Sequence, residues 1–432
     1  MSSLADSARK PLSLDGISND TVRKAYDAIE RMSGGDQALA LPLYRKFREQ
    51  GPLVRGDGGY FPEGFVVPPQ IAVELLARGT PSAMTLNHAS LREAMSDSGR
   101  FGFDAYKNLG PGRTPLLTDG QEHRRVRILL AKGLNPKSIR HWEDDLINPV
   151  VLELIGRFKS RGKAELRAEL TEPLPARAIG AVLGLPASDL PQFNVLALLQ
   201  QLPHTEPDSH LAMSRLHAYF FEQITVRRRL TPAILSQRED VISLMLTARD
   251  GNDDGFSDDE INGILHFLLF AGTETTNRTL ANAITYLLHD QSTFDAVRND
   301  RSLVPKAIEE TLRLAPGGAL NARVARLDTE ICGVPIAKGT LIILNILMGN
   351  RDSDIWDRPD EFDIFRLPRQ HVAFGVGGHM CPGMHLARLE MKIALNLLFD
   401  HCTNLRLDPD YPKPELRGIG LIGSTPIHVL FD

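Results

Sequence analysis

The stretch that decides the fold lies near the C-terminus and reads Phe374-Gly-Val-Gly-Gly-His-Met-Cys381-Pro382-Gly383. Its glycines permit backbone conformations that other residues rarely adopt, and they let another group approach the chain closely. Pro382 fixes the chain directly after the sulfur and removes a hydrogen-bond donor. Backbone N–H groups beyond Cys381 can then point at the sulfur, so the composition indicates a loop that holds one thiolate in a fixed direction.

The segment that follows this loop, Met384–Phe399, carries apolar residues at helical spacing. Cys381 therefore precedes the N-terminus of a predicted helix, where the helix dipole favours a negative charge. The alternative for this segment alone is a buried structural cysteine in a glycine-rich turn.

The bulk composition is that of an ordinary globular protein. The chain has 432 residues, of which 42% are hydrophobic and 24% are charged, and its net charge is −5. This length allows two or three domains or one large core that encloses a cofactor. The slight acidity gives no reason to expect nucleic acid as a partner.

Cysteine usage and the N-terminus indicate a cytoplasmic protein. The three cysteines, Cys332, Cys381 and Cys402, are odd in number and widely spaced, unlike a disulfide framework or a zinc site. The first ten residues are polar, no apolar run approaches the roughly 20 residues that span a bilayer, and no signal-peptide pattern is present.

Residue patterns along the chain predict a mainly α protein with small β-sheets. Residues from about 120 to 315 are mostly helical in pattern, whereas 51–90 and 321–345 contain short strands and turns. A β-rich tail ends at Ile427–Phe431. We expect the first 35 or so residues, which are polar, to be partly mobile.

The longest apolar helix is predicted from about Asp259 to His289 and contains Ala271-Gly-Thr-Glu-Thr-Thr276. A glycine and three threonines are poor helix formers. The Thr275 hydroxyl can bond the Ala271 carbonyl and open the helix locally. Glu274 places an ionisable group in the same apolar run. The alternative is a polar stretch that faces solvent.

Two further pairs lie on single helix faces. Glu310 and Arg313 are three residues apart, and His123 and Arg127 are four apart. Two donors on one face can clamp a carboxylate. Each pair alone is also common on ordinary surface helices.

Together these segments resemble the cytochrome P-450 family, and the resemblance runs from about residue 40 to 432. The motif F-x-x-G-x-x-x-C-x-G is matched by Phe374, Gly377, Cys381 and Gly383, the motif A-G-x-[D/E]-T by Ala271, Gly272, Glu274 and Thr275, and E-x-x-R by Glu310 and Arg313. The resemblance implies one cytochrome P-450 haem domain over residues 1–432, of the soluble bacterial kind, without a membrane anchor or a fused reductase.

The resemblance also implies roles for single residues. Cys381 would be the axial ligand of the iron in haem b. His123, Arg127, Arg323 and His379 would bind the haem propionates, and Phe374, Gly375, Gly383 and Ala271 would contact the cofactor. Glu310 and Arg313 would form a structural pair with a third member, for which Arg366 is the best candidate.

The implied activity is that of a haem-thiolate monooxygenase, which inserts one atom of O2 into a hydrophobic small molecule by hydroxylation. Thr275 would steer protonation and Glu274 would supply protons. The loop Phe101–Leu117 with Tyr106 and a lid formed by Leu190–Arg229 would complete the substrate pocket. The pocket itself would be lined by Phe267, Phe270, Ala271, Ala319, Leu320, Asn321, Leu421 and Ile422.

Electrons would come from a separate ferredoxin and an NAD(P)H-dependent reductase, since no flavin or ferredoxin sequence is present. A basic face for the ferredoxin could comprise His123–Arg125, Lys132, Lys137 and Arg140, although a solvated helix face is an equal alternative.

Two other functions are open: a peroxide-driven peroxygenase and a non-catalytic haem-binding sensor. The sequence does not identify the substrate.

Overall fold

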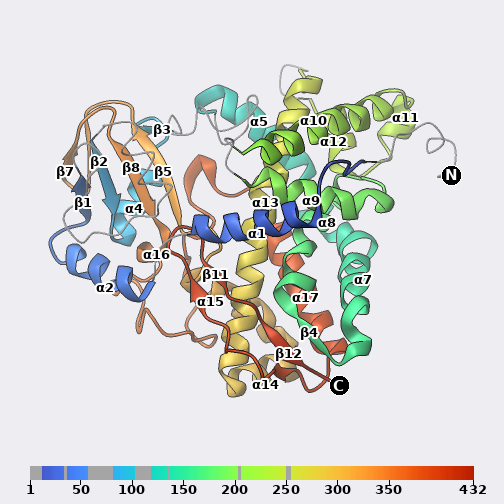
Figure 1. Cartoon of the computed structure of the whole chain (residues 1–432). Coiled ribbons are helices and arrows are strands. Elements are labelled where there is room, and N and C mark those ends of the chain that lie inside the picture. The colour runs from blue at the N-terminus through green and yellow to red at the C-terminus, as the bar shows by residue number, and fades with distance from the viewer. Residues whose placement is uncertain are drawn as a thin grey trace.

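The computed structural model describes residues 12–33, 37–56, 81–102, 118–134, 136–202, 206–249 and 254–432. Helices dominate, the largest sheet lies at one side of the molecule, and strands β4 (Lys163–Glu165), β11 (Gly423–Ser424) and β12 (His428–Leu430) lie among the helices (Figure 1). The predicted fold class is therefore confirmed.

The centre of the helical part is α13 (Asp258–His289). Its start is fixed by Ser257, whose hydroxyl accepts from the Glu260 amide while the Glu260 carboxylate accepts from the Ser257 amide. This capping box and the acidic first turn stabilise the positive end of the helix dipole. The predicted boundaries agree with the observed ones to within one residue.

The other helices pack around α13 or cover the sheet. They are α1 (Asn19–Ser33), α2 (Gln37–Arg48), α4 (His88–Ser96), α5 (Gly120–Gly133), α6 (Pro136–Trp142), α7 (Asn148–Phe158), α8 (Pro173–Val182), α9 (Leu190–Gln200), α10 (Pro207–Arg228), α11 (Pro232–Leu235), α12 (Val241–Thr247), α14 (Gln291–Asn299), α15 (Val304–Leu314), α16 (Ile346–Gly349) and α17 (Met384–His401). Short 3-10 or π turns are η2 (Glu143–Ile147), η3 (Lys159–Arg161), η4 (Arg167–Thr171), η5 (Ala187–Asp189), η6 (Arg301–Leu303) and η7 (Gly377–His379). Helices α8, α9, α10, α15 and α17 all contact α13.

The largest sheet has the strand order β1-β2-β8-β5-β3, in which only β2 and β8 are parallel. Its strands are β1 (Leu53–Gly56), β2 (Ser82–Thr85), β3 (Phe101–Gly102), β5 (Leu320–Ala325) and β8 (Leu341–Asn345). Both faces of β8 are buried, because Leu341 and Ile343 pack under α2 whereas Ile342 and Leu344 pack under α4. Each such side chain contributes about 1.5–3 kcal/mol on burial, which fixes the strand register.

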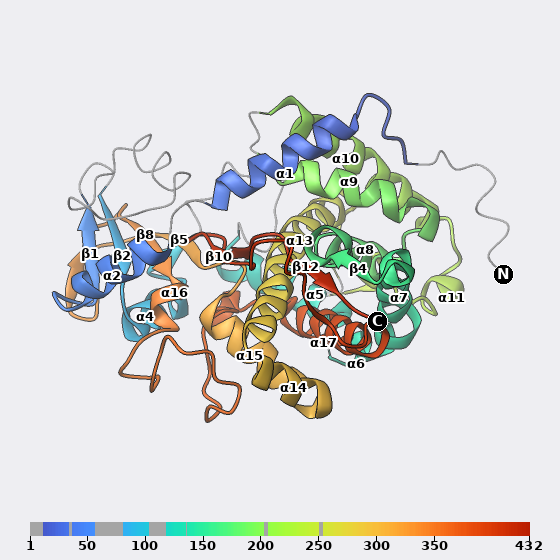
Figure 2. The same cartoon turned by 60° about the horizontal axis from the view of Figure 1, so that its bottom comes forward.

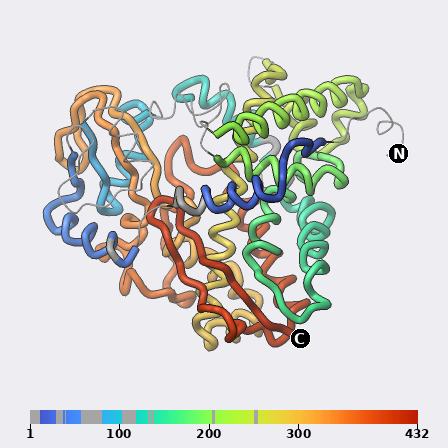
Figure 3. Tube along the Cα trace, in the orientation of Figure 1, coloured from blue at the N-terminus to red at the C-terminus, as the bar shows by residue number. Residues whose placement is uncertain are grey.

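Smaller sheets join distant parts of the chain. Strand β12 (His428–Leu430) lies between β4 (Lys163–Glu165) and β9 (Arg406–Leu407). The other two sheets are the hairpin of β6 (Thr329–Ile331) with β7 (Val334–Ile336) and the pair β10 (Leu416–Arg417) with β11 (Gly423–Ser424). Figure 3 shows the tail after α17, in red, running along the helical part to the C-terminus. The predicted β-rich tail is thus present.

The N-terminal helix α1 was not predicted from the sequence. It lies across α9 in both Figure 1 and Figure 2 and contacts that helix. Its apolar stripe of Val22, Ala25 and Tyr26 packs against the main core, while Asp20, Arg23 and Lys24 form ion pairs on its outer face. The helix was not recognised in the sequence because its apolar stripe is narrow and most of its other residues are charged or polar.

No described helix of the protein combines the length and the apolarity that crossing a membrane requires.

Candidate active site

The cysteine loop is held by its own backbone. The Cys381 amide donates to the Phe374 carbonyl at 2.8 Å, and the Met380 amide donates to the Gly377 carbonyl at 3.1 Å. Gly375 and Gly377 have positive φ angles of 71° and 77°, which other residues adopt only at a cost. A Cβ atom on Gly377 would also lie 3.1 Å from the Ser96 Cα. The loop therefore needs glycine at this position for both conformation and space.

Opposing effects act on the Cys381 thiol. Burial raises its pKa, whereas the backbone N–H groups of Gly383 and Met384 and the charges of Arg127 and Arg388 lower it. The net direction is upward, so the polypeptide alone does not ionise this thiol at neutral pH. A bound metal cation supplies the positive charge that ionises a coordinating thiol. The sulfur and its two amide donors thus fit a metal-ligating role.

An ion pair fastens the loop to α15. Arg388 of α17 donates from Nε and Nη2 to the two carboxylate oxygens of Glu309, at 2.6 and 2.8 Å. The same guanidinium lies over the Phe374 ring, 4.6 Å from its centre, in a cation–π contact. Burial would raise the pKa of Glu309, but hydrogen bonds from Arg388 and His371 lower it to about 2. Arg388 was not predicted from the sequence, because no local spacing links it to Phe374.

The two predicted propionate-binding histidines lie together, with stacked rings whose centres are 3.8 Å apart. His379 Nε2 is 2.8 Å from an oxygen of Asp119, which also forms an ion pair with Arg326. Burial, aided by the charges of His379 and Arg127, lowers the pKa of His123 to about 4, so His123 is neutral at pH 7. Asp119 and Arg326 were not predicted, although Asp119 stands four residues before His123.

The two predicted arginines differ in their surroundings. Arg127 is partly buried, and its guanidinium makes no hydrogen bond to the described residues. Burial lowers the pKa of Arg127, and the negative charge of Cys381 opposes that shift. Arg323 is buried on β5 and donates from Nη1 to the Ala322 carbonyl at 2.8 Å. Buried guanidinium groups need anionic partners, so this donor set fits a dianionic cofactor.

The middle of α13 carries a ladder of threonine hydroxyls that bond carbonyls four residues back. Thr273 donates to Leu269 at 2.5 Å, Thr275 to Ala271 at 2.8 Å and Thr279 to Thr275 at 2.7 Å. Such bonds slightly destabilise a helix, yet α13 is continuous through these residues. Thr275 keeps exposed surface, whereas Thr273 is buried. The predicted Thr275–Ala271 bond is therefore present.

Glu274, next to Thr275 in the sequence, is buried. Its Oε1 accepts from Arg278 Nε at 2.6 Å, and both side chains are almost inaccessible to solvent. The ion pair compensates the cost of burying the carboxylate. The spacing of four residues between Glu274 and Arg278 could have revealed this partner.

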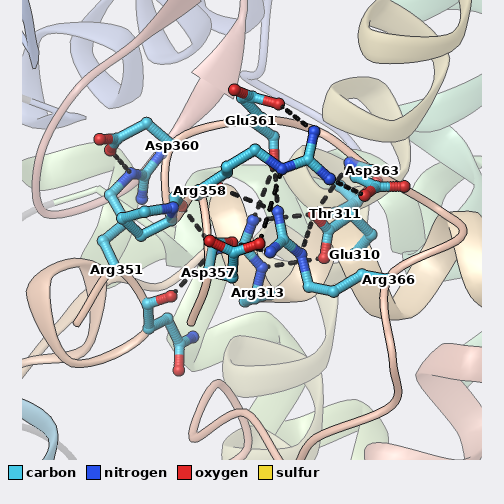
Figure 4. A network of polar contacts seen from close by, with 12 residues as sticks. Glu310, Thr311, Arg313, Arg351, Asp357, Arg358, Asp360, Glu361, Asp363 and Arg366 are labelled. Atoms are coloured by element: carbon cyan, nitrogen blue, oxygen red, sulfur yellow. Dashed lines mark hydrogen bonds and ion pairs between the residues drawn. The ribbon is translucent and has the colours of Figure 1, made fainter. Parts of the chain in front are cut away.

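A buried network surrounds the predicted structural pair (Figure 4). Arg313 donates to both oxygens of Glu310 at 2.8 Å. Arg366 Nε donates to Glu310 Oε1 at 3.3 Å, and the Asp363 amide donates to the same atom at 3.0 Å. The structure therefore brings together the three side chains that the sequence singled out. Arg313 also bonds three backbone carbonyls, those of Asn350, Pro359 and Glu361.

The predicted pocket residues fall into two groups. Side chains with exposed surface are Phe267, Phe270, Ala271, Leu320, Asn321 and Leu421. Ala319 and Ile422 are fully buried and pack with Ala315 and Leu347 in a separate apolar cluster. Only the first group keeps surface that a ligand could contact in this structure.

Other predicted segments are only partly described. Residues 103–117, with Tyr106, lie outside the described residues, as do residues 203–205 between α9 and α10. Arg124 and Arg140 are exposed, but Arg125 pairs with Glu260 of α13 at 2.7 Å. Arg125 therefore does not belong to a free basic face, which corrects that part of the expectation.

These features define the class of a haem-thiolate protein: a cysteine loop before a helix, two arginines whose charges act on its sulfur, and a central helix with threonine hydroxyls bonded to its carbonyls. A model of the cytochrome P-450 family matches residues 185–431. The chain therefore belongs to the cytochrome P-450 family, whose members are haem-containing monooxygenases.

Bacterial proteins of this family are similar to the chain over most of its length. Cyclomarin C epoxidase CymV of Salinispora arenicola is 33% identical over 72% of this chain and 79% of its own. Nocardicin C N-oxygenase of Nocardia uniformis is 31% identical over 77% of this chain and 85% of its own. The crystal structure of CYP109E1 from Bacillus megaterium in complex with testosterone matches with a TM-score of 0.77 at 25% identity, covering 90% of this chain and 99% of that one.

Proposed function

We propose that this cytochrome P-450 hydroxylates a hydrophobic small molecule with O2, using haem b and electrons from a ferredoxin and an NAD(P)H-dependent reductase. The observation that carries the proposal is the partly buried Cys381, whose sulfur accepts from two backbone amides and lies in the field of Arg127 and Arg388. We propose one haem domain over the whole chain and the cytoplasm as its location, in keeping with the free state of all three cysteines.

Bound haem would supply the oxygen-activating chemistry. Cys381 would hold its iron, with Phe374, Gly375, Gly383 and Ala271 against the ring. Arg127, Arg323, His123 and His379 would bind the propionates, and Asp119 would fix the ring of His379.

The protein's own residues would handle protons and water. The Thr275 hydroxyl, which donates its only proton to the Ala271 carbonyl, would accept a hydrogen bond at the oxygen-binding groove. Glu274, held by Arg278, would accept a proton from the solvent side and pass it on. Phe267, Phe270 and Ala271 would exclude bulk water and contact the apolar substrate.

The relatives support an apolar or bulky substrate without identifying it. The testosterone complex of CYP109E1 concerns a steroid, whereas CymV and the N-oxygenase act on cyclomarin C and nocardicin C. We therefore propose a hydrophobic small molecule and leave its class to experiment.

The test is a screen of steroids, terpenoids, fatty acids and macrolides for a shift of the ferric haem from low to high spin. Compounds that give the shift are then incubated with ferredoxin, reductase, NAD(P)H and isotopically labelled O2. We expect a hydroxylated product that carries one labelled atom. Faster turnover with hydrogen peroxide would indicate a peroxygenase instead, and no product from any compound would indicate a sensor.

The peroxygenase alternative has less support in the structure. Such enzymes bind a substrate carboxylate with residues that replace the acid–threonine pair. Here Glu274 and Thr275 are both present, and Glu274 neutralises the adjacent cation, Arg278.

A further inference from the structure

A small polar cavity lies beside the Glu274 carboxylate, beneath the N-terminal helix. Its volume is about 10 Å³, which is near the lower limit for one water molecule. The polar side chains that line it are those of Tyr26, Glu172, Asn194, Gln201, Thr273, Glu274 and Asn277. A buried water needs two to four polar partners, and this lining provides more than that number.

Hydrogen bonds fix the walls of the cavity. Glu274 uses Oε1 for Arg278, and no described donor bonds its second oxygen. Glu172 pairs with Arg167 Nε at 3.0 Å, and Asn277 accepts from the Thr171 hydroxyl at 2.8 Å. Because these neighbours hold the two carboxylates in place, a single water between them would have a defined position.

Tyr26 covers the cavity from the side of α1. Burial raises the pKa of this phenol, and the charges of Glu172 and Glu274 raise it further. The phenol is therefore close to both carboxylates. The N-terminal segment is tied down, since Arg215 of α10 donates to the carbonyls of Ser13 and Asp15.

We propose that one water molecule in this cavity joins Glu172 to Glu274, that protons enter the oxygen-activating site by this route, and that Tyr26 positions the water. A proton from solvent adds to the Glu172 carboxylate. Glu172 then protonates the water, which releases another proton to Glu274, and Glu274 passes it toward Thr275. Each member gains and loses one proton and returns to its starting state. This inference rests on the proposed role of Glu274.

The first test needs no turnover. A high-resolution crystal structure of the haem-bound enzyme should contain an ordered water within hydrogen-bond distance of both Glu172 and Glu274. In Tyr26→Phe this water should move or lose occupancy. A dry cavity, or a side chain that fills it in the wild type, overturns the proposal even if no substrate is known.

The second test compares Tyr26→Phe, Glu172→Gln and Asn194→Leu with the control Asp27→Asn, which changes an exposed residue of the same helix. The substrate is a compound that gives the spin shift. NAD(P)H-driven product formation should fall about tenfold, a modest share of what general acid catalysis contributes. The solvent isotope effect should rise and more hydrogen peroxide should be released.

Peroxide-driven turnover distinguishes a variant with impaired proton delivery from one with a damaged structure. Peroxide brings its own protons, so its product yield should match the wild type in all three variants. If the three variants show wild-type rates and isotope effects with O2, the proposed route is wrong. It is also wrong if they lose product formation equally with O2 and with peroxide. If the proposed function itself fails, the wild type also gives no product.

Discussion

Two consecutive residues of α13, Glu274 and Thr275, lie in different surroundings. Glu274 is buried against Arg278, whereas Thr275 keeps exposed surface and bonds the Ala271 carbonyl. A helix turns by about 100° per residue, so consecutive side chains necessarily face different surroundings. The acid therefore lies beside the polar cavity, whereas the adjacent hydroxyl keeps exposed surface.

Replacing Thr275 with alanine should uncouple turnover. The loss of the hydroxyl removes the hydrogen-bonding group from the groove, so we expect NAD(P)H to be consumed while hydrogen peroxide appears in place of product. The yield of product per NAD(P)H should fall about tenfold or more, in line with the loss of a proton-transfer group. Product and peroxide are measured together with O2 uptake.

The matched control is Thr276→Ala, which removes a buried hydroxyl one position along the same helix. It should keep the wild-type yield of product. Fully coupled turnover in Thr275→Ala, or equal uncoupling in both variants, would contradict the assigned role.

At the scale of elements, the cysteine loop requires glycine at position 377 more strictly than at position 378. Gly377 has a φ of 77° and its Cβ would press on the Ser96 Cα and the Met95 carbonyl, whereas a Cβ on Gly378 would meet only His123 at 3.8 Å. Gly377→Ala should lower the free energy of unfolding by about 2 kcal/mol and reduce haem content. Denaturant unfolding and the haem-to-protein ratio give the measurement. Gly378→Ala, the control, should change both little, and equal effects would contradict this account of the loop.

The network around Glu310 joins α15 to the segment that leads into the cysteine loop. Glu310→Gln would leave the buried guanidinium of Arg313 without its charge partner, so we expect a loss of about 3 kcal/mol in the free energy of unfolding. Urea unfolding measures this loss. Glu361→Gln is the control, because the exposed Glu361–Arg358 pair in the same network should contribute less than about 1 kcal/mol. A Glu310 variant as stable as the control would contradict the structural role.

For the molecule as a whole, acid stability should depend on the ion pair that fastens the cysteine loop. The pKa of Glu309 falls from its ordinary 4.5 to about 2 in the folded state. A depressed carboxyl pKa stabilises the fold fully above the unfolded value and loses that contribution as the pH falls through the folded value. The wild type should therefore lose more stability than Glu309→Gln between about pH 5 and pH 2. Parallel pH curves from denaturant unfolding of the two proteins would contradict this.

The sequence predicted those features that depend on local pattern. The boundaries of α13 followed from its acidic start and long apolar run, and the Thr275–Ala271 bond followed from spacing alone. Contacts between distant segments could not be predicted from the sequence, because only the tertiary fold brings such segments together. Examples are the contact of Asp119 with His379 and that of Arg388 with Phe374. The helix α1 was missed because its apolar stripe is short and its outer face is charged. The burial of Ala319 and Ile422 depends on packing that residue type does not reveal.

The most direct test of the account is the ligand of the haem iron. The CO-bound ferrous form of the wild type should show the red-shifted Soret band that a thiolate ligand produces. Cys381→Ser should abolish that band, while Cys332→Ser, which changes an exposed cysteine, should keep it. An unchanged red-shifted band in Cys381→Ser would contradict the central claim that this sulfur binds the iron.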